Sequence, residues 1–134
     1  MISIKTIHSI VAIAQILMAA GMIHFWYKWF RTEHKEEWLP NGYEEHECVF
    51  VYPDMVLSIL MITSAILLFT GNSFGEKLTL ICGGMMLFLI IMDIAYFIQH
   101  GMFAKEKDGV KNLWGLIVPM VVMSILMTVP FIFL

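Results

Sequence analysis

The residues from about Leu78 to Phe103 constrain the fold of this chain more than any other stretch. Nearly all of them are apolar, and a helix of roughly 20 apolar residues matches the hydrocarbon thickness of a bilayer. The same stretch nevertheless contains Asp93, Tyr96 and His100. An ionisable group at membrane depth costs about 2.5 kcal/mol or more unless it faces a bundle interior, a partner or water. We therefore expect the other segments to surround this one.

Three further apolar stretches accompany it, and together they account for most of the chain. The 134 residues are 60% hydrophobic and only 14% charged, whereas a soluble domain is about a quarter charged. This pattern predicts an all-α fold, an integral membrane up-down bundle of four transmembrane helices that forms one domain over residues 1–134. The predicted spans are about 4–27, 53–70, 78–103 and 113–134, and a polar loop covers 28–52.

Small residues and prolines indicate how the spans end and pack. Gly71 is a typical helix-ending residue and predicts a tight loop between the second and third spans. Gly83 and Gly84 predict a close crossing near the start of the third span. Pro119 predicts a kink in the fourth span, because proline interrupts the hydrogen bonds of a helix.

The loop at 28–52 is the only predicted extramembrane segment of any size. It is acidic, and it contains a turn signal at 39–42. We expect a short interfacial helix or an ordered hairpin-like loop here, anchored in the interface by aromatic side chains. The aromatic residues in question are Trp38, Tyr43, Phe50 and Tyr52.

The distribution of Lys and Arg predicts the orientation in the membrane. Six of the eight cationic residues lie on the side of the first and third loops, and two lie on the other side. Because positive charges are enriched in cytoplasmic loops, we predict that loops 28–52 and 104–112 are cytoplasmic and that both termini lie outside.

Cysteine usage and net charge exclude two classes of function. Cys48 and Cys82 fall on opposite predicted membrane sides and form no C-x-x-C pair, which excludes a thiol oxidoreductase of that kind. The net charge of −3 argues against nucleic acid as a partner.

The candidate site consists of polar groups near one side of the predicted bundle. Asp93, Tyr96 and His100 lie within about 60° of one helical face. His24 near the end of the first span and Asp54 at the start of the second belong to the same side. These five residues predict a ligand-binding or proton-handling vestibule. In the structural alternative, hydrogen bonds to Tyr96 or to a neighbouring helix hold Asp93, which then only fixes packing.

Metal binding is the weaker interpretation of the histidines and acidic residues. His24 and His100 form a candidate pair for a metal or haem, but isolated histidines near an interface more often bind backbone carbonyls or headgroups. The loop segment from Glu44 to Cys48, with His34 upstream, matches no closed zinc site, and a solvated acidic loop is favoured. We predict no metal site and assign no cofactor.

Three functions remain open at this point. The first is binding of a small apolar molecule or lipid in a cavity around Asp93, with a proton-coupled carrier as one form of it. The second is a non-catalytic subunit or assembly factor of a larger membrane complex, with a second copy or another membrane protein as partner. The third is a membrane-embedded isomerase or reductase that uses Asp93 with His24 or His100. The residues do not decide whether the protein is an enzyme.

Overall fold

The structure, a computed structural model, describes residues 1–35, 37 and 39–134. This described part is all-helical, and four of its helical segments are long and apolar enough to cross a membrane, as the sequence predicted. The long helices are α1 (Ile4–Arg31), α3 (Val51–Phe69), α4 (Phe74–Gln99) and α5 (Val118–Phe133), the last preceded by the π-helical segment η3 (Lys111–Ile117). The short helices are η1 (Glu33–Lys35), α2 (Tyr43–Val49) and η2 (Lys105–Lys107).

Two glycines in the left-handed region end α3 and α4. Gly71 has φ 71°, and the next N–H, that of Asn72, donates to the Leu67 carbonyl at 2.9 Å. Gly101 has φ 63° and is followed by a bond from the Met102 N–H to the Phe97 carbonyl at 2.8 Å. Both are Schellman-type ends. The helix end predicted at Gly71 is thereby confirmed. Both ends of α4 lie four residues earlier in the chain than the predicted span 78–103.

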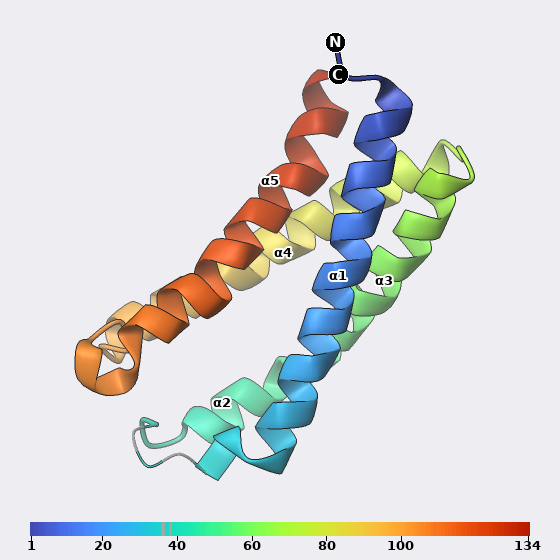
Figure 1. Ribbon diagram of the computed structural model, residues 1–134. Helices are drawn as coiled ribbons and strands as arrows, with labels where there is room; N and C mark the ends of the chain where they lie inside the picture. The colour runs from blue at the N-terminus through green and yellow to red at the C-terminus, as the bar shows by residue number, and fades with distance from the viewer. Residues whose placement is uncertain (36, 38) are drawn as a thin grey trace.

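The helices are arranged as two antiparallel pairs that diverge from one end (Figure 1). α1 packs chiefly along α3, α5 chiefly along α4, and α3 along α4, whereas α1 and α5 touch over a much shorter stretch. Both termini and the loop between α3 and α4 lie where the pairs meet, which we call the closed end (Figure 1). The opposite half, where the pairs separate and α2 lies beside the last turns of α1, is called the open end (Figure 1).

Small residues bring α4 and α5 together toward the closed end. A Cβ added to Gly83 would lie 3.2 Å from the Cβ of Met127 and would overlap the Thr128 methyl group. The Ser124 hydroxyl also donates to the Gly83 carbonyl at 3.1 Å. A Cβ added to Gly84 would meet nothing within 4 Å. The predicted close crossing therefore belongs to Gly83 alone.

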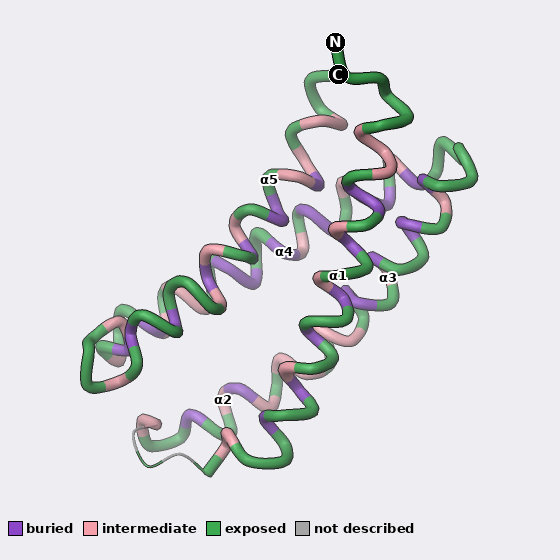
Figure 2. The backbone as a smooth tube through the Cα atoms, viewed as in Figure 1, coloured by how far each residue is buried: buried purple, intermediate pink, exposed green. Residues whose placement is uncertain are grey.

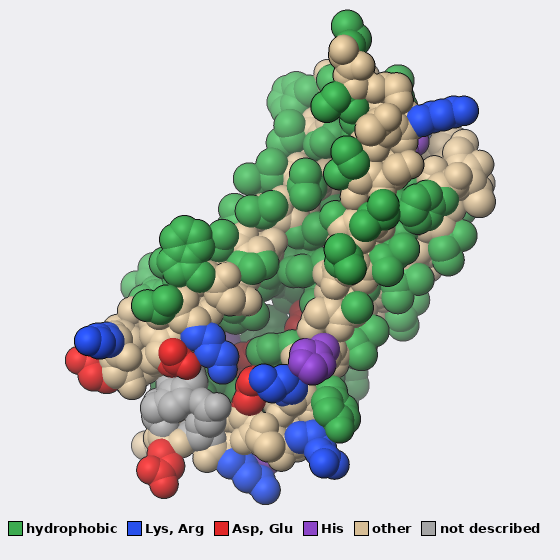
Figure 3. Space-filling view, in the orientation of Figure 1, with side chains coloured by type: hydrophobic (Ala, Val, Ile, Leu, Met, Phe, Trp, Pro, Cys, Tyr) green, Lys and Arg blue, Asp and Glu red, His purple; other side chains and the backbone are tan. Residues whose placement is uncertain are grey.

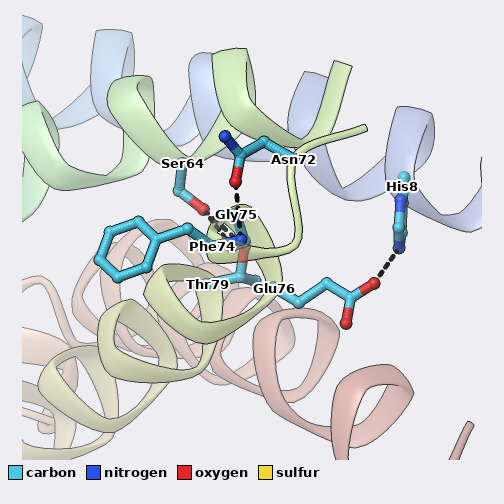
Figure 4. A network of polar contacts seen from close by, with 7 residues as sticks. All are labelled: His8, Ser64, Asn72, Phe74, Gly75, Glu76 and Thr79. Carbon is cyan, nitrogen blue, oxygen red and sulfur yellow. Dashed lines mark hydrogen bonds and ion pairs between the residues drawn. The ribbon is translucent and has the colours of Figure 1, made fainter. Parts of the chain in front are cut away.

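Three buried polar side chains of the closed end hydrogen-bond to one another and to the backbone. The Ser64 and Thr79 hydroxyls both donate to the Gly75 carbonyl, at 3.1 and 2.7 Å (Figure 4). From α1, the Gln15 Nε2 donates to those two hydroxyl oxygens at 3.3 and 3.4 Å. The network ties α1, α3 and α4 together, as buried polar groups do in helix bundles, although the Gln15 Oε1 has no partner among the described residues.

Two further contacts at the same end fix the start of α4. The Asn72 side-chain oxygen accepts from the Phe74 N–H at 2.9 Å (Figure 4). One turn along, the Glu76 carboxylate lies 3.1 Å from His8 Nε2 on α1 (Figure 4). The His8 ring also stacks on Phe131 of α5, with 5.8 Å between centroids. The closed end is therefore joined by contacts among all four long helices.

Burial follows the facing sides of the helices, and the outer faces are apolar (Figures 2 and 3). Buried positions of α1 recur every three or four residues on one stripe. The outward positions carry large apolar side chains, more of them than a soluble monomer usually exposes. Examples from each long helix are Ile13, Leu17, Ile59, Ile66, Phe88, Ile91, Val122 and Ile125.

Candidate functional site

A cavity of about 240 Å³ lies at the open end, between the two helix pairs. Side chains from α1, α2, α3, α4, η3 and α5 all contribute to it, and we call it the inner cavity. Figure 3 shows a hollow between α1 and α5 with acidic side-chain atoms inside it. The lining residues are Met18, Gly21, Met22, Phe25, Glu47, Phe50, Asp54, Leu89, Asp93, Gly115, Leu116, Pro119 and Met120.

Three carboxylates from three helices face this mainly apolar cavity. Glu47 comes from α2, Asp54 from α3 and Asp93 from α4. Glu47 is only 6% exposed, and the three groups are close enough to interact electrostatically. Of the described residues that line the cavity, none is Lys, Arg or His. The ion pairs among described residues involve none of these carboxylates either.

Asp54 and Asp93, both predicted from the sequence, are held differently. The Trp26 indole N–H donates to Asp54 Oδ2 at 2.9 Å, and the Ser58 hydroxyl donates to the Asp54 backbone carbonyl at 2.8 Å. Asp93 is half-buried, and within the described part no protein group donates a hydrogen bond to its carboxylate. The hydrogen bonds to Asp93 from Tyr96 or a neighbouring helix that the structural alternative requires are thus not found among the described residues.

Tyr96 and His100 do not share the cavity with Asp93. The Tyr96 ring instead lies between two histidine rings, 3.8 Å from that of His46 on α2 and 4.0 Å from that of His100 by centroid. His100 Nδ1 is 3.0 Å from the Tyr96 backbone oxygen. Asp93 is thus separated from Tyr96 and His100, which were predicted to share its site. The reason is that α2 packs against the last turns of α4, where Tyr96 and His100 form an aromatic stack with His46.

His24 lines a second cavity, of about 230 Å³, which we call the outer cavity. The two cavities share Gly21, Phe25, Gly115 and Leu116, so together they follow the gap between α1 and η3. The outer cavity also contains Lys28, Glu33 and Lys111. The Glu33 carboxylate lies 3.3 Å from Lys28 Nζ and 3.7 Å from Lys111 Nζ, and so it links η1 to both sides of the gap.

The π-helical winding of η3 coincides with the wall of both cavities. The sequence predicted a kink at Pro119, and the structure shows a π-helix that ends two residues before this proline. Because proline has no N–H and its ring crowds the preceding turn, regular α-helical bonding is lost there. Gly115 within η3 adds no side chain, which keeps the gap beside α1 open. Single π-helical turns are often found at functional sites.

The predicted loop residues fold into α2 and the turns beside it. Tyr43 is buried, Phe50 is half-buried and Tyr52 is exposed, while the predicted anchor Trp38 lies outside the described residues. The short helix was expected, but the burial of Glu47 in a cavity was missed. Its signal was available in the spacing of Tyr43 and Glu47, which places both on one face of a helix.

The described residues contain no group of three or more His, Cys, Asp or Glu side chains arranged to hold a metal ion. The acidic residues around His46 lie on different faces of α2, and His24 and His100 belong to separate features of the site. The arrangement is therefore that of a helical bundle with a small, acidic and otherwise apolar cavity. No protein-family model, curated protein or solved structure matches the chain.

Proposed function

We propose that this chain is a multi-pass membrane protein that binds a small apolar molecule or lipid in the inner cavity beside Asp93. The observation that carries the proposal is the cavity itself, which every long helix helps to form and which holds Asp93. Its wall is mostly Met, Leu, Phe and Gly, as in sites that bind apolar ligands with a few polar groups. Its volume is small for such sites, so it suits a small ligand or one chain of a lipid.

Membrane insertion is supported by the outward faces of the four long helices. Exposed Ile, Leu, Val and Phe cover them, and in hydrocarbon these side chains stabilise the inserted state, whereas in water they would favour aggregation. We infer that in a bilayer α2 and the loop 104–112 lie on one side and both termini on the other, an arrangement that the antiparallel order of the helices supports.

The orientation is testable with the native cysteines, since Cys48 on α2 is partly exposed and Cys82 on α4 is buried. In a Cys82→Ser background, an impermeant maleimide applied to intact cells is expected to leave Cys48 unlabelled, because the cationic side is predicted to be cytoplasmic. Labelling of Cys48 should appear after the cells are opened. Full labelling of Cys48 in intact cells would reverse the orientation.

Ligand binding can be tested with an uncharged aryl diazirine that carries a tert-butyl group. After photolysis of the protein in nanodiscs, mass spectrometry would locate the label. We expect it at cavity residues Met18 and Leu116 and at the lipid-facing reference residues Ile59 and Ile125. A label confined to the reference residues would contradict the proposal.

Gly21→Phe provides the matching variant, because Gly21 lines both cavities and an added Cβ meets nothing within 4 Å. The phenyl ring is expected to fill the gap and remove labelling at Met18 and Leu116 while the reference labelling stays. Gly84→Phe is the control, since an added Cβ at Gly84 is equally unobstructed and Gly84 lines neither cavity. Loss of cavity labelling in both variants would show that a phenylalanine disturbs the bundle as a whole, and not that the Gly21→Phe ring fills the cavity.

The two alternatives predict different results in the same experiment. A subunit or assembly factor needs an outer helix face and no occupied cavity, so its labelling would be insensitive to Gly21→Phe. An isomerase or reductase that used Asp93 with His24 or His100 would need both groups at one substrate. His100 lies in the aromatic stack and His24 in the outer cavity, so the geometry favours binding.

A further inference from the structure

We infer that the ligand of the inner cavity is an organic cation, a single positive charge on an apolar body. This inference rests on the proposed function, because it specifies the ligand of the same cavity. It depends on the uneven distribution of charge between the inner and outer cavities. The inner cavity holds Glu47, Asp54 and Asp93 and none of the basic side chains, while the outer cavity holds Lys28 and Lys111.

The two lysines of the outer cavity already have a partner. Glu33 lies within 3.7 Å of both Lys28 Nζ and Lys111 Nζ. An anionic ligand would have to displace the Glu33 carboxylate to reach those ammonium groups, and it would meet the field of three carboxylates further in. The outer cavity therefore has one carboxylate beside two lysines, whereas the inner cavity has three carboxylates and no basic side chain.

The burial of Glu47 also supports a cationic ligand. Its side chain is 6% exposed and still contributes to the cavity wall. A buried carboxylate is stable only when a cation, a proton or hydrogen-bond donors compensate for lost water. Asp54 has the Trp26 indole N–H as a donor, and the Tyr43 hydroxyl, one turn away on α2, is a donor to Glu47. These donors are neutral, and no described Lys, Arg or His pairs with Glu47 or Asp93. A cationic ligand would supply the missing charge.

The apolar part of the wall suits an alkylated ammonium group in particular. The Phe25 and Phe50 rings line the cavity together with the thioethers of Met18, Met22 and Met120. Aromatic faces attract cations, by about 2 kcal/mol or more where water is excluded, and methionine adapts to irregular ligand shapes. Neutral apolar ligands would gain the same packing without the electrostatic attraction.

The test compares two probes of equal shape, an aryl diazirine carrying either a trimethylammonium or a tert-butyl group. In nanodiscs, we expect the cation to label Met18 and Leu116 about tenfold more than the neutral probe does, relative to Ile59 and Ile125, since 1.4 kcal/mol corresponds to a factor of ten. Equal labelling of the cavity by both probes would overturn the cation preference and leave the proposed function standing. Absence of cavity labelling by both probes would overturn the proposed function as well.

Two variants test whether the cavity carboxylates cause the preference for the cationic probe. Asp93→Asn and Glu47→Gln, made separately, are each expected to reduce the advantage of the cationic probe several-fold while the neutral probe labels as before. The neutral probe thereby reports that each variant is folded and its cavity accessible. Glu76→Gln, at the closed end, is the control and should keep the full preference. A preference unchanged in both cavity variants would contradict the inference.

Discussion

At the closed end of the bundle, Gln15, Ser64 and Thr79 hydrogen-bond to one another and to a backbone carbonyl, and glycine lets the helices touch. At the open end, by contrast, Glu47 and Asp93 face a cavity with no basic partner. Both ends place polar groups among apolar helices. The polar side chains of the closed end bond mainly to one another, with only the Gln15 Oε1 left without a partner among the described residues, whereas Asp93 at the open end has no described donor. The difference indicates that the closed end maintains the fold and that the open end is suited to a group from outside.

The largest effect is expected from Gly83→Leu at the closed end. The new side chain would collide with Met127 and Thr128 on α5, and overpacking of this kind destabilises by about 1–3 kcal/mol. The free energy of unfolding can be measured by titrating the protein in mild detergent with SDS. Gly84→Leu is the matched control, because an added Cβ there is unobstructed. Equal stability of the two variants would show that the α4–α5 contact is looser than described.

A smaller loss of stability is expected from Thr79→Val. The change removes one acceptor of the Gln15 amide and one hydroxyl bound to the Gly75 carbonyl, which corresponds to about 1 kcal/mol in a membrane bundle. Thr63→Val is the control, since the Thr63 hydroxyl faces outward and bonds only within its own helix at Ile59. If the two valine variants unfold alike, the buried network does not hold the closed end.

The smallest effect is expected from Asp93→Asn at the open end. The amide has nearly the shape of the acid, and no described protein group loses a hydrogen bond to it, so the free energy of unfolding should change by less than about 0.5 kcal/mol. The same SDS titration applies. Destabilisation larger than that of Thr79→Val would show that Asp93 supports the fold, and the contrast between the two ends would disappear.

Much of the architecture was predictable because it depends on local chemistry. The long apolar stretches predicted the helices, and Gly71 predicted the end of α3. Gly101 is also a helix-ending glycine in the left-handed region, and α4 ends before it, whereas the predicted third span continues to residue 103. No simple pattern predicts the π-helical winding of η3, which depends on how Pro119 and the neighbouring helices are accommodated together.

The candidate site was only partly predictable because it depends on packing between distant segments. Helical periodicity placed Asp93, Tyr96 and His100 on one face, but it carried no information on where α2 would pack. In the structure, α2 covers Tyr96 and His100 and brings Glu47 to the cavity. His24 reaches only the outer cavity. A sequence pattern describes one helix at a time, whereas a cavity is defined by several.

An experimental structure of the protein in lipid would test the central claim most directly. We predict non-protein density in the gap between α1 and η3, in contact with Met18 and Leu116 and with its polar end beside Asp93. The helix pairs should be separated at the open end as they are here. A gap closed by α1 packing against α5, with Phe25 and Met120 filling the space beside Asp93, would contradict the account.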